Sequence, residues 1–193
     1  MDPKLTGKSD DELVVLFQKT GSDKAFEEIV IRYKNSLYQY ILSMVKDEGA
    51  AGDLFQEVFL SFFRHADSYS AQGKFKSWLF LTARNKVLNY FRDTRQPLSL
   101  DQTDEDGNFV FYDTLGDDQP SLLDALSAQE LAEQIRQVSL KLPPNQREVI
   151  YLRQYLSFKE IAEVVNRPLG TVLADCHRGI QKMQQLLQAH IAK

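Results

Sequence analysis

A basic and aromatic segment in the middle of the chain has the composition of a nucleic-acid-binding surface. Residues 74–95, KFKSWLFLTARNKVLNYFRDTR, contain six Lys or Arg residues, one acid and five aromatic side chains. Asn85, Asn89 and Arg92 follow at i, i+4 and i+7, the spacing of one helix face. Basic residues hold phosphates, aromatic rings stack on bases, and asparagine can hydrogen-bond a base edge. The segment predicts contact with nucleic acid, although several aromatic residues, Trp78 among them, are expected in the core.

A second segment, residues 156–180, has the pattern of a helix-turn-helix. Ser157 and Glu160 have the spacing of a capping box, which predicts the start of a helix. Asn166 suits a left-handed turn between two helices, and Pro168 suits the start of the second. Four apolar residues at helical spacing are expected to pack back onto the first helix: Val172, Cys176, Ile180 and Met183. The alternative is an ordinary helical hairpin.

A third segment, residues 53–65, predicts a helix with two different faces. The apolar stripe expected in the core consists of Leu54, Phe55, Val58, Phe59, Phe62 and Phe63. The opposite face carries Asp53, Gln56, Glu57, Ser61 and Arg64, with Leu60 among them. A solvated polar face is the ordinary interpretation, but an exposed leucine within an acidic and amide-bearing patch indicates a surface that docks on another protein.

Helical signals fill both ends of the chain, and no alternating strand pattern competes with them. A capping box at Ser9 and Glu12 opens the first helix, and Gly21 and Ser22 separate it from the next. The further predicted helices are 25–46, 53–65, 75–92, 128–140, 145–153, 157–165 and 169–189. The fold class predicted is all-α, with two small helical domains joined by an acidic flexible linker.

The linker is defined by its charge and its breakers. Residues 97–128 contain no Lys or Arg and eight acids, within a chain of 193 residues whose net charge is −4. Four breakers interrupt any helical periodicity there: Pro97, Gly107, Gly116 and Pro120. The predicted domains are therefore 1–96 and 128–193, with the linker at 97–127. A solvated spacer is one interpretation of it, whereas the apolar run from Phe109 to Tyr112 suggests a segment that docks on something.

Several classes of protein are disfavoured by what the sequence lacks. There is no phosphate-cradling glycine loop, metal-ligand spacing or Ser-His-Asp pattern, so we expect no catalytic residue, cofactor or metal and no enzyme. Cys176, the single cysteine, cannot form an intramolecular disulfide, and it is expected in the core with His177 partly exposed. No stretch approaches the roughly 18 apolar residues of a membrane span, and no secretory signal is expected. A soluble intracellular protein is the expectation.

Three stretches taken together resemble a bacterial sigma factor of the extracytoplasmic-function (ECF) group of the sigma-70 family. They are DLFQEVFLSFFRHADSY (53–69), FKSWLFLTARNKVLNYFRD (75–93) and LPPNQREVIYLRQYLSFKEIAEVVNRPLGTV (142–172), in the order and spacing of that family. The resemblance spans essentially the whole chain. It implies a cytoplasmic factor that binds RNA polymerase core, directs it to promoters and opens the minus-10 region.

The resemblance implies roles for individual residues. Those matching the helix that docks on the polymerase clamp are Asp53, Gln56, Glu57 and Leu60. Residues 66–76 match a loop that captures a flipped base, and the residues expected to contact minus-10 DNA, duplex and single-stranded, are Lys74, Lys76, Trp78, Arg84, Asn85, Lys86, Asn89 and Arg92. The linker matches a segment that threads the RNA exit path. The C-terminal block matches the minus-35 reader, which also rests on the polymerase flap, and an anti-sigma factor is a further family expectation.

The second helix of the helix-turn-helix departs from the family pattern. Family members commonly carry basic residues where this chain has Leu173, Asp175 and Ile180. The residues expected to face minus-35 DNA are Arg167, Thr171, Ala174, Asp175, Arg178 and Lys182. Asp175 in that position would repel phosphates, but it could accept a hydrogen bond from cytosine N4.

Two explanations of this departure stay open, and a third class of protein is weighed beside them. The helix reads an unusual minus-35 sequence through few contacts, or the chain is a sigma-like adaptor. An adaptor would delegate upstream targeting to another DNA-bound or nucleic-acid-guided partner that holds the C-terminal domain. The third class, a dimeric helix-turn-helix repressor, would have a dimer interface and no polymerase-docking helix.

Overall fold

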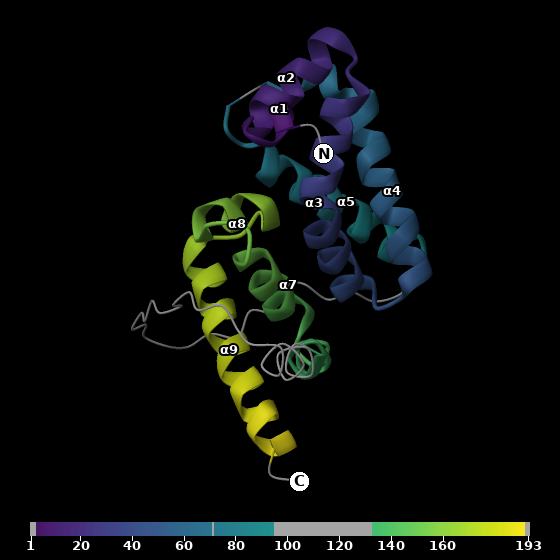
Figure 1. Cartoon of the computed structure of the whole chain (residues 1–193). Coiled ribbons are helices and arrows are strands. Elements are labelled where there is room, and N and C mark those ends of the chain that lie inside the picture. The colour runs from purple at the N-terminus through teal and green to yellow at the C-terminus, as the bar shows by residue number, and fades with distance from the viewer. Residues whose placement is uncertain (1–2, 71, 95–132, 192–193) are drawn as a thin grey trace.

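The protein is described here by a computed structural model of residues 3–70, 72–94 and 133–191 (Figure 1). The predicted linker at 97–127, with Phe109–Tyr112, lies outside the described residues. Within them every regular element is a helix, which confirms the all-α prediction. The elements are α1 (Pro3–Thr6), α2 (Asp10–Thr20), α3 (Asp23–Val45), α4 (Glu48–His65), η1 (Ala66–Ser68), α5 (Phe75–Asp93), α7 (Pro144–Arg153), α8 (Phe158–Val165) and α9 (Leu169–Ile191). Residues 133–139 are also helical.

The first helices begin and end where local chemistry predicts. The Glu12 amide donates to Ser9 Oγ at 3.2 Å and the Ser9 amide donates to Glu12 Oε2 at 2.7 Å, which completes the capping box of α2. Gly21 ends that helix with a left-handed φ of 61°, and the Ser22 side chain caps α3. Both boundaries confirm the sequence prediction.

The helix predicted at 53–65 is longer than its apolar pattern indicates. It begins at Glu48, so Gly49 and Gly52 lie inside it and do not precede it. The Asp47 side chain accepts a hydrogen bond from the Ala50 amide at 2.7 Å and caps the helix, while Ala51 is buried in the core. The cap and the burial of Ala51 favour a start at Glu48 and oppose the roughly 1 kcal/mol that each helical glycine costs.

The C-terminal half, residues 133–191, contains the predicted helix-turn-helix. The Ser157 hydroxyl and the Glu160 carboxylate form the capping box of α8, and Asn166 ends that helix with a left-handed φ of 52°. Pro144 occupies the first turn of α7, where a missing amide hydrogen costs nothing. Figure 1 shows α9 running away from the N-terminal helices. None of the described helices is long and apolar enough to cross a membrane.

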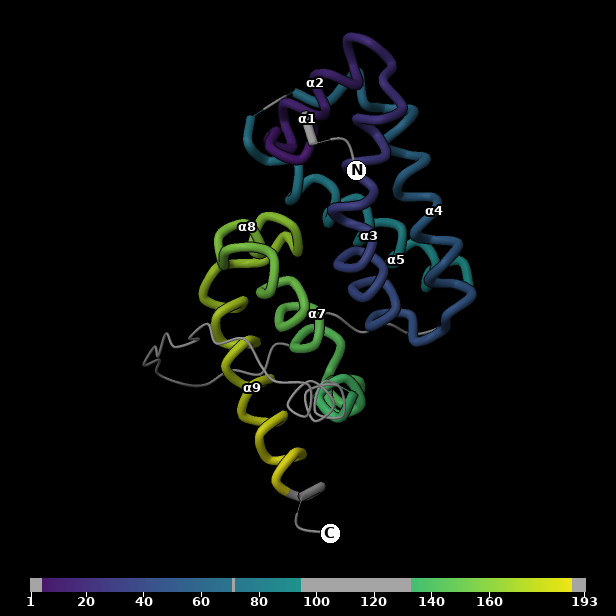
Figure 2. Tube along the Cα trace, viewed as in Figure 1, coloured from purple at the N-terminus to yellow at the C-terminus, as the bar shows by residue number. Residues whose placement is uncertain are grey.

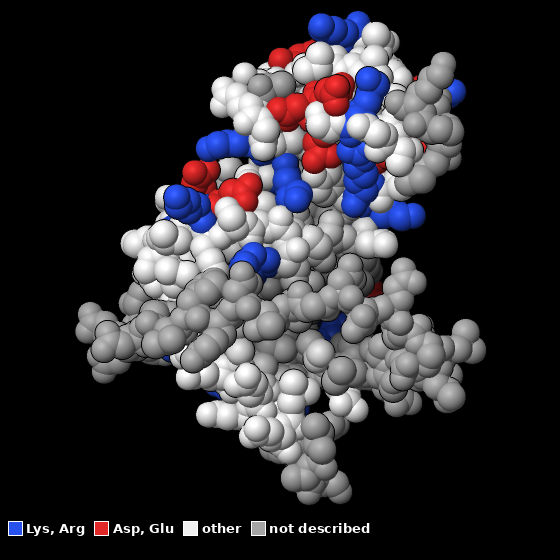
Figure 3. Space-filling model, turned by 60° about the vertical axis from the view of Figure 1, so that its left-hand side comes forward, with Lys and Arg blue, Asp and Glu red and all other residues white. Residues whose placement is uncertain are grey.

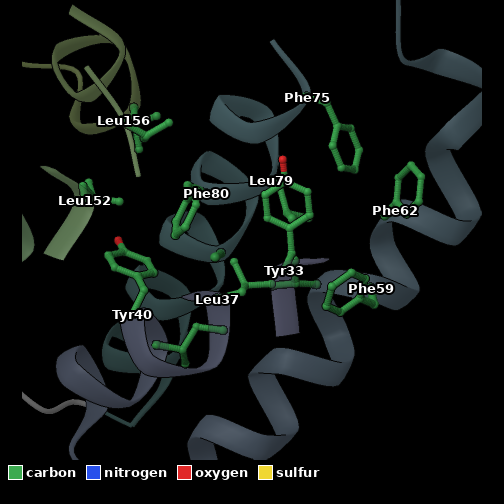
Figure 4. Close-up of a cluster of buried hydrophobic side chains, with 14 of the residues drawn as sticks. Tyr33, Leu37, Tyr40, Phe59, Phe62, Phe75, Leu79, Phe80, Leu152 and Leu156 are labelled. Atoms are coloured by element: carbon green, nitrogen blue, oxygen red, sulfur yellow. The ribbon is translucent and has the colours of Figure 1, made fainter. Parts of the chain in front are cut away.

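The N-terminal half, residues 3–94, and the C-terminal half share one hydrophobic core. In the chain trace α7 lies beside α3, and α8 packs against α5 (Figure 2). Leu152 of α7 and Leu156 beyond it face Tyr40 and Phe80 of the N-terminal half (Figure 4). The Phe80 ring stacks on the Tyr155 ring with centroids 5.4 Å apart. The two halves therefore pack as one body in this structure.

Candidate nucleic-acid interface

The stripe predicted along α5 faces solvent. Asn85, Asn89 and Arg92 are all exposed, as the helical spacing predicts. Leu81 is also exposed and stands one turn before Asn85, at the head of the same stripe. Sequence analysis missed Leu81, and its spacing of i−4 from Asn85 was the available signal. The stripe offers two amides, a guanidinium and an apolar side chain along one helix face.

A pocket of about 310 Å³ lies beside the head of this stripe. Its walls come from the loop after α4, the start of α5 and the end of α8, and consist of Ser68, Tyr69, Ser70, Gln72, Lys74, Ser77, Trp78, Leu81, Glu163 and Val164. Trp78 is half-buried, because its ring packs against the rings of Phe62, Tyr69 and Phe75 while it also lines the pocket. Hydroxyls, an amide and aromatic faces are the groups that hold an unstacked base.

The loop that forms one wall of the pocket is held by α2. Gln18 Nε2 donates to the carbonyl oxygens of Ala66 and Tyr69, at 2.7 and 2.8 Å. The Tyr69 hydroxyl donates to Asp11 Oδ1 at 2.9 Å, and the Gly73 amide donates to the other oxygen of Asp11. Burial and the bond to Asp11 raise the pKa of the Tyr69 hydroxyl, so that it stays a donor. These bonds fix the positions of Ala66, Tyr69 and Gly73 relative to α2.

Four of the five basic residues predicted to contact minus-10 DNA are paired with acids of the same chain. The pairs, with their N···O distances, are Lys74–Glu163 (3.2 Å), Arg84–Glu148 (2.9 Å), Lys86–Glu57 (2.9 Å) and Arg92–Asp93 (3.1 Å). Figure 3 shows the consequence for the face it displays, where basic and acidic side chains are interspersed on the described surface. Exposed pairs of this kind are worth about 0–1 kcal/mol, so phosphates can replace the acids.

The Arg84–Glu148 pair differs from the other three because it is buried. Its side chains are 12% and 1% exposed, and Glu148 Oε1 also accepts a hydrogen bond from the Tyr40 hydroxyl at 3.0 Å. Burial, followed by the charge of Glu148, raises the pKa of Tyr40 well above its usual value. Glu148 belongs to α7, whereas Arg84 and Tyr40 belong to α5 and α3. One carboxylate thus connects the two halves of the chain.

The exposed face of α4 carries the residues predicted to dock on a protein. Asp53, Gln56, Glu57 and Leu60 are all exposed. Phe63, which was expected in the core stripe, is 54% exposed, and that prediction was wrong. An apolar groove of about 440 Å³ lies next to Leu60, lined by Phe26, Val30, Phe55, Gln56, Phe59, Leu60 and Phe63. Leu60 and Phe63 line this open groove, and the Phe63 ring also packs against the rings of Phe17 and Phe26.

The position of Asp175 corrects a sequence prediction. It was expected on the exposed face of the second helix of the helix-turn-helix, but it is fully buried. Its Oδ2 accepts from Arg167 Nη1 at 2.6 Å, and its Oδ1 accepts from Arg178 Nη2 at 2.9 Å and from Asn145 Nδ2 at 3.2 Å. Three hydrogen-bond donors offset the free-energy cost of removing this carboxylate from water. Asp175 therefore binds the turn, α9 and α7 together, and it does not face DNA.

The buried face of α9 differs in part from the predicted one, since Val172 and Cys176 are buried as predicted but Met183 is only partly buried. It consists of Val172, Asp175, Cys176 and Gly179, whereas Ile180, predicted in the core, is 46% exposed. The cause lies at Gly179, where an added Cβ would lie 2.6 Å from Cδ1 of Ile150 on α7. Since no side chain separates the helices at that point, α9 approaches α7 closely and turns Ile180 outward.

The other residues predicted to face minus-35 DNA divide by exposure. Lys182 is exposed, Thr171 and Ala174 are partly exposed, and Arg167 and Arg178 are half-buried against Asp175. Cys176 is buried as predicted, which raises the pKa of its thiol, and His177 is exposed. The described residues contain no group of His, Cys, Asp and Glu that could hold a metal ion.

Both halves of the chain match models of one known protein family. Residues 29–96 match the family model described as Sigma-70 region 2, and residues 132–183 match the one described as Sigma-70, region 4. The chain is 33% identical to ECF RNA polymerase sigma factor SigW of Bacillus subtilis, over 88% of this chain and 92% of that protein. It is 30% identical to ECF RNA polymerase sigma-E factor of Escherichia coli K12, over 95% of this chain and 97% of that protein.

Two solved structures share the fold. One is CnrH in complex with the cytosolic domain of CnrY, with a TM-score of 0.63 and 22% identity over 94% of this chain and 99% of that one. The other is the sigma factor RpoE in complex with the anti-sigma factor NepR from Bartonella quintana. It has a TM-score of 0.63 and 22% identity over 86% of this chain and 98% of that one.

The burial of Asp175 predicts a large loss of stability on substitution. Asp175→Ala leaves two half-buried guanidinium groups without their shared carboxylate, which costs about 3–5 kcal/mol when one partner of a buried ion pair is removed. The measurement is urea unfolding of the whole chain followed by circular dichroism. Asp67→Ala, the same substitution at an exposed position, is the control and should change the free energy of unfolding by less than about 0.5 kcal/mol. Equal effects of the two substitutions would show that Asp175 is not buried.

Proposed function

The chain belongs to the ECF group of the sigma-70 family and is a sigma factor that directs RNA polymerase in transcription initiation, and we propose how its residues divide this work. Residues 1–96 form the region 2 domain that docks on core polymerase and opens the minus-10 element. Residues 128–193 form the region 4 domain that faces minus-35 DNA and the polymerase flap, and residues 97–127 are the acidic linker. The observation that carries the proposal is the exposed Leu81–Asn85–Asn89–Arg92 stripe beside the pocket at the head of α5.

The minus-10 strand binds along this stripe in the proposed arrangement. Lys74, Lys76, Arg84, Lys86 and Arg92 supply positive charge for phosphates, while Trp78, Asn85 and Asn89 contact bases. Extruding a base costs a few kcal/mol, and stacking on an aromatic ring recovers about 1–3 kcal/mol per base. Support for a capture site comes from Ala66, Tyr69 and Gly73, which Gln18 and Asp11 hold in place beside the pocket.

The clamp of core polymerase docks on the exposed face of α4. Asp53, Gln56 and Glu57 supply polar contacts, and Leu60 supplies an apolar anchor at the edge of the 440 Å³ groove. An anchor in an apolar setting with a polar rim is the usual anatomy of a protein interface. Because these residues lie on α4 and the DNA stripe lies on α5, region 2 can bind polymerase and DNA at once.

One further partner proposal follows from the family. RpoE of Bartonella quintana was solved with the anti-sigma factor NepR, and we propose that an anti-sigma factor also binds this chain. A factor that works on RNA polymerase acts in the bacterial cytoplasm. Since the chain belongs to the sigma-70 family, a dimeric repressor is not needed to explain its helix-turn-helix.

Delegated upstream targeting remains a second candidate, and Asp175 favours it. Two of the minus-35 candidates, Arg167 and Arg178, are half-buried and share one carboxylate. Each good base contact is worth about 1–3 kcal/mol of discrimination, so a helix whose arginines are engaged elsewhere discriminates weakly. In this version another DNA-bound or nucleic-acid-guided partner holds region 4 upstream.

Docking predicts that Asp53→Ala combined with Gln56→Ala weakens binding to core polymerase. Loss of two interface contacts should cost about 1–2 kcal/mol, or roughly 5- to 30-fold in affinity. Titration of labelled chain with core polymerase measures it. The matched control is Asp67→Ala with Gln154→Ala, two exposed residues of the same types outside α4. If the variant binds core polymerase as tightly as the control does, the assignment of these residues to docking is wrong.

The minus-10 assignment predicts that Asn85→Ala impairs promoter opening and leaves core binding unchanged. The loss of an amide that contacts a base edge should reduce opening roughly tenfold, as expected for a contact worth about 1–3 kcal/mol. Permanganate reactivity of minus-10 thymines in the holoenzyme complex reports the opening. Asn35→Ala, at an exposed position of α3, is the control. Normal permanganate reactivity in Asn85→Ala would refute the role of this residue.

The two candidates for region 4 are separated by selecting promoters from randomised DNA with holoenzyme alone. A minus-35 reader enriches both elements, since each mismatched base pair costs about 1–3 kcal/mol. Delegated targeting enriches a minus-10 sequence without a minus-35 sequence. Sequencing the selected pool gives the answer, and a defined minus-35 motif would exclude delegation.

A further inference from the structure

Leu81 is an exposed apolar side chain on the helix face to which the minus-10 strand was assigned. In α5, which is described over its whole length, the other large apolar side chains are buried or half-buried, whereas Leu81 is 37% exposed. A lone exposed leucine is ordinary on a protein surface, so exposure by itself indicates no function. The position of Leu81 is informative, because it lies one turn before Asn85 on the stripe and also lines the pocket beside Trp78.

The pocket wall contains one side chain that can select a base by an apolar contact. Of the described region 2 residues that line the pocket, Leu81 is the one whose side chain has no polar atom; the others are Ser68, Tyr69, Ser70, Gln72, Lys74, Ser77 and Trp78. Among the four bases of DNA, thymine is the one with an aliphatic group, its C5 methyl. Contact between the leucine and this methyl removes apolar surface of both from water. Hydroxyls and amides can bond the edge of any base, whereas Leu81 favours thymine.

The spacing of Leu81 and Asn85 sets the distance between the bases that the two side chains would meet. Four residues of an α-helix rise about 6 Å. Successive nucleotides of a B-form strand are about 3.4 Å apart along the axis. A thymine held by Leu81 is therefore expected one or two nucleotides from the base that Asn85 contacts.

We propose that Leu81 is a specificity-determining residue of the minus-10 site, which selects a thymine by packing against its C5 methyl group. This inference rests on the proposed assignment of the α5 stripe to the minus-10 strand, and it adds the identity of one base. Burial of one carbon group of this size corresponds to roughly fourfold in affinity. Removal of the methyl should weaken binding by about that factor, and only while the leucine is present.

The test compares thymine with deoxyuridine, which has the same hydrogen-bonding edge and lacks the methyl group. Core polymerase assembled with this chain is titrated with fluorescent fork-junction DNA. The DNA carries the minus-10 sequence selected by the holoenzyme as a single strand and has no minus-35 element. Each thymine of that strand is replaced in turn by deoxyuridine.

Three variants of the chain are titrated beside the unmodified one. Leu81→Ala removes the apolar contact, and Leu81→Met keeps an apolar side chain of similar size. Leu169→Ala is the matched control, because it is the same substitution at a leucine that is 39% exposed and lies on α9.

With the unmodified chain, one thymine should show a roughly fourfold loss of affinity when deoxyuridine replaces it. This thymine should lie within two nucleotides of the position at which Asn85→Ala loses base discrimination. Leu81→Ala should bind the thymine DNA more weakly and show no further loss with deoxyuridine at that position. Leu81→Met and Leu169→Ala should both retain the loss.

Three results would overturn the inference. If deoxyuridine weakens binding equally in Leu81→Ala and in the unmodified chain, a group other than Leu81 contacts the methyl. If deoxyuridine has no effect at any thymine in the unmodified chain, the methyl is not recognised. A selected minus-10 sequence without thymine has the same meaning.

Asn85→Ala separates failure of this inference from failure of the minus-10 assignment. If the α5 stripe does not bind the strand, Asn85→Ala and Leu81→Ala both bind the fork DNA as the unmodified chain does, and both proposals fail. If the stripe binds the strand but Leu81 does not select thymine, Asn85→Ala weakens binding. In that case the ratio of thymine to deoxyuridine affinity is the same with leucine or alanine at position 81, and only the inference on Leu81 fails.

Discussion

The burial of α7 on two sides is the constraint on which the arrangement of this protein depends. Five consecutive residues, 145–149, are buried, although four of them are polar or charged. A helix in this position has to satisfy its polar side chains within the protein, because water does not reach them. One oxygen of Glu148, Oε1, accepts from Arg84 and Tyr40 of region 2, and Asn145 donates to Asp175 of α9. The same helix therefore fixes both the closure of the two halves and the orientation of the helix-turn-helix.

This arrangement explains why a sigma factor of net charge −4 shows no dominant basic surface on the face drawn in Figure 3. Four of the five cations of the proposed minus-10 site are paired with Glu57, Asp93, Glu148 and Glu163. Arg167 and Arg178 of the proposed minus-35 site are paired with Asp175. Most of these pairs are exposed and cheap to exchange, whereas those of Glu148 and Asp175 are buried. In our proposals the exposed pairs give way to phosphates, and Asp175 keeps two arginines from the bases.

Most helix boundaries could be predicted from local signals in the sequence. The capping boxes at Ser9 and Ser157, the left-handed Gly21 and Asn166, and Pro144 all depend on neighbours within a few residues, so the sequence reveals them directly. The exposed stripe of Asn85, Asn89 and Arg92 was predictable for the same reason, because helical periodicity alone places side chains on one face. The start of α4 was not predicted. The Asp47 cap and Ala51 favour helix there and the two glycines disfavour it, and the burial of Ala51 depends on packing.

The sequence by itself determined the family, the all-α fold and the helices that carry the candidate sites, because these follow from local propensity and from motifs in fixed order. Only the tertiary structure decided which charged side chains are buried and which acids pair with which bases. Nothing near Asp175 in the chain indicates that Asn145, thirty residues away, would help to bury it, or that Gly179 would rotate α9 toward α7. Nor does the sequence show that Glu148 would meet Arg84, sixty-four residues away, across two halves of the molecule. Burial and pairing of charge depend on contacts distant in sequence, and only the packed molecule brings those residues together.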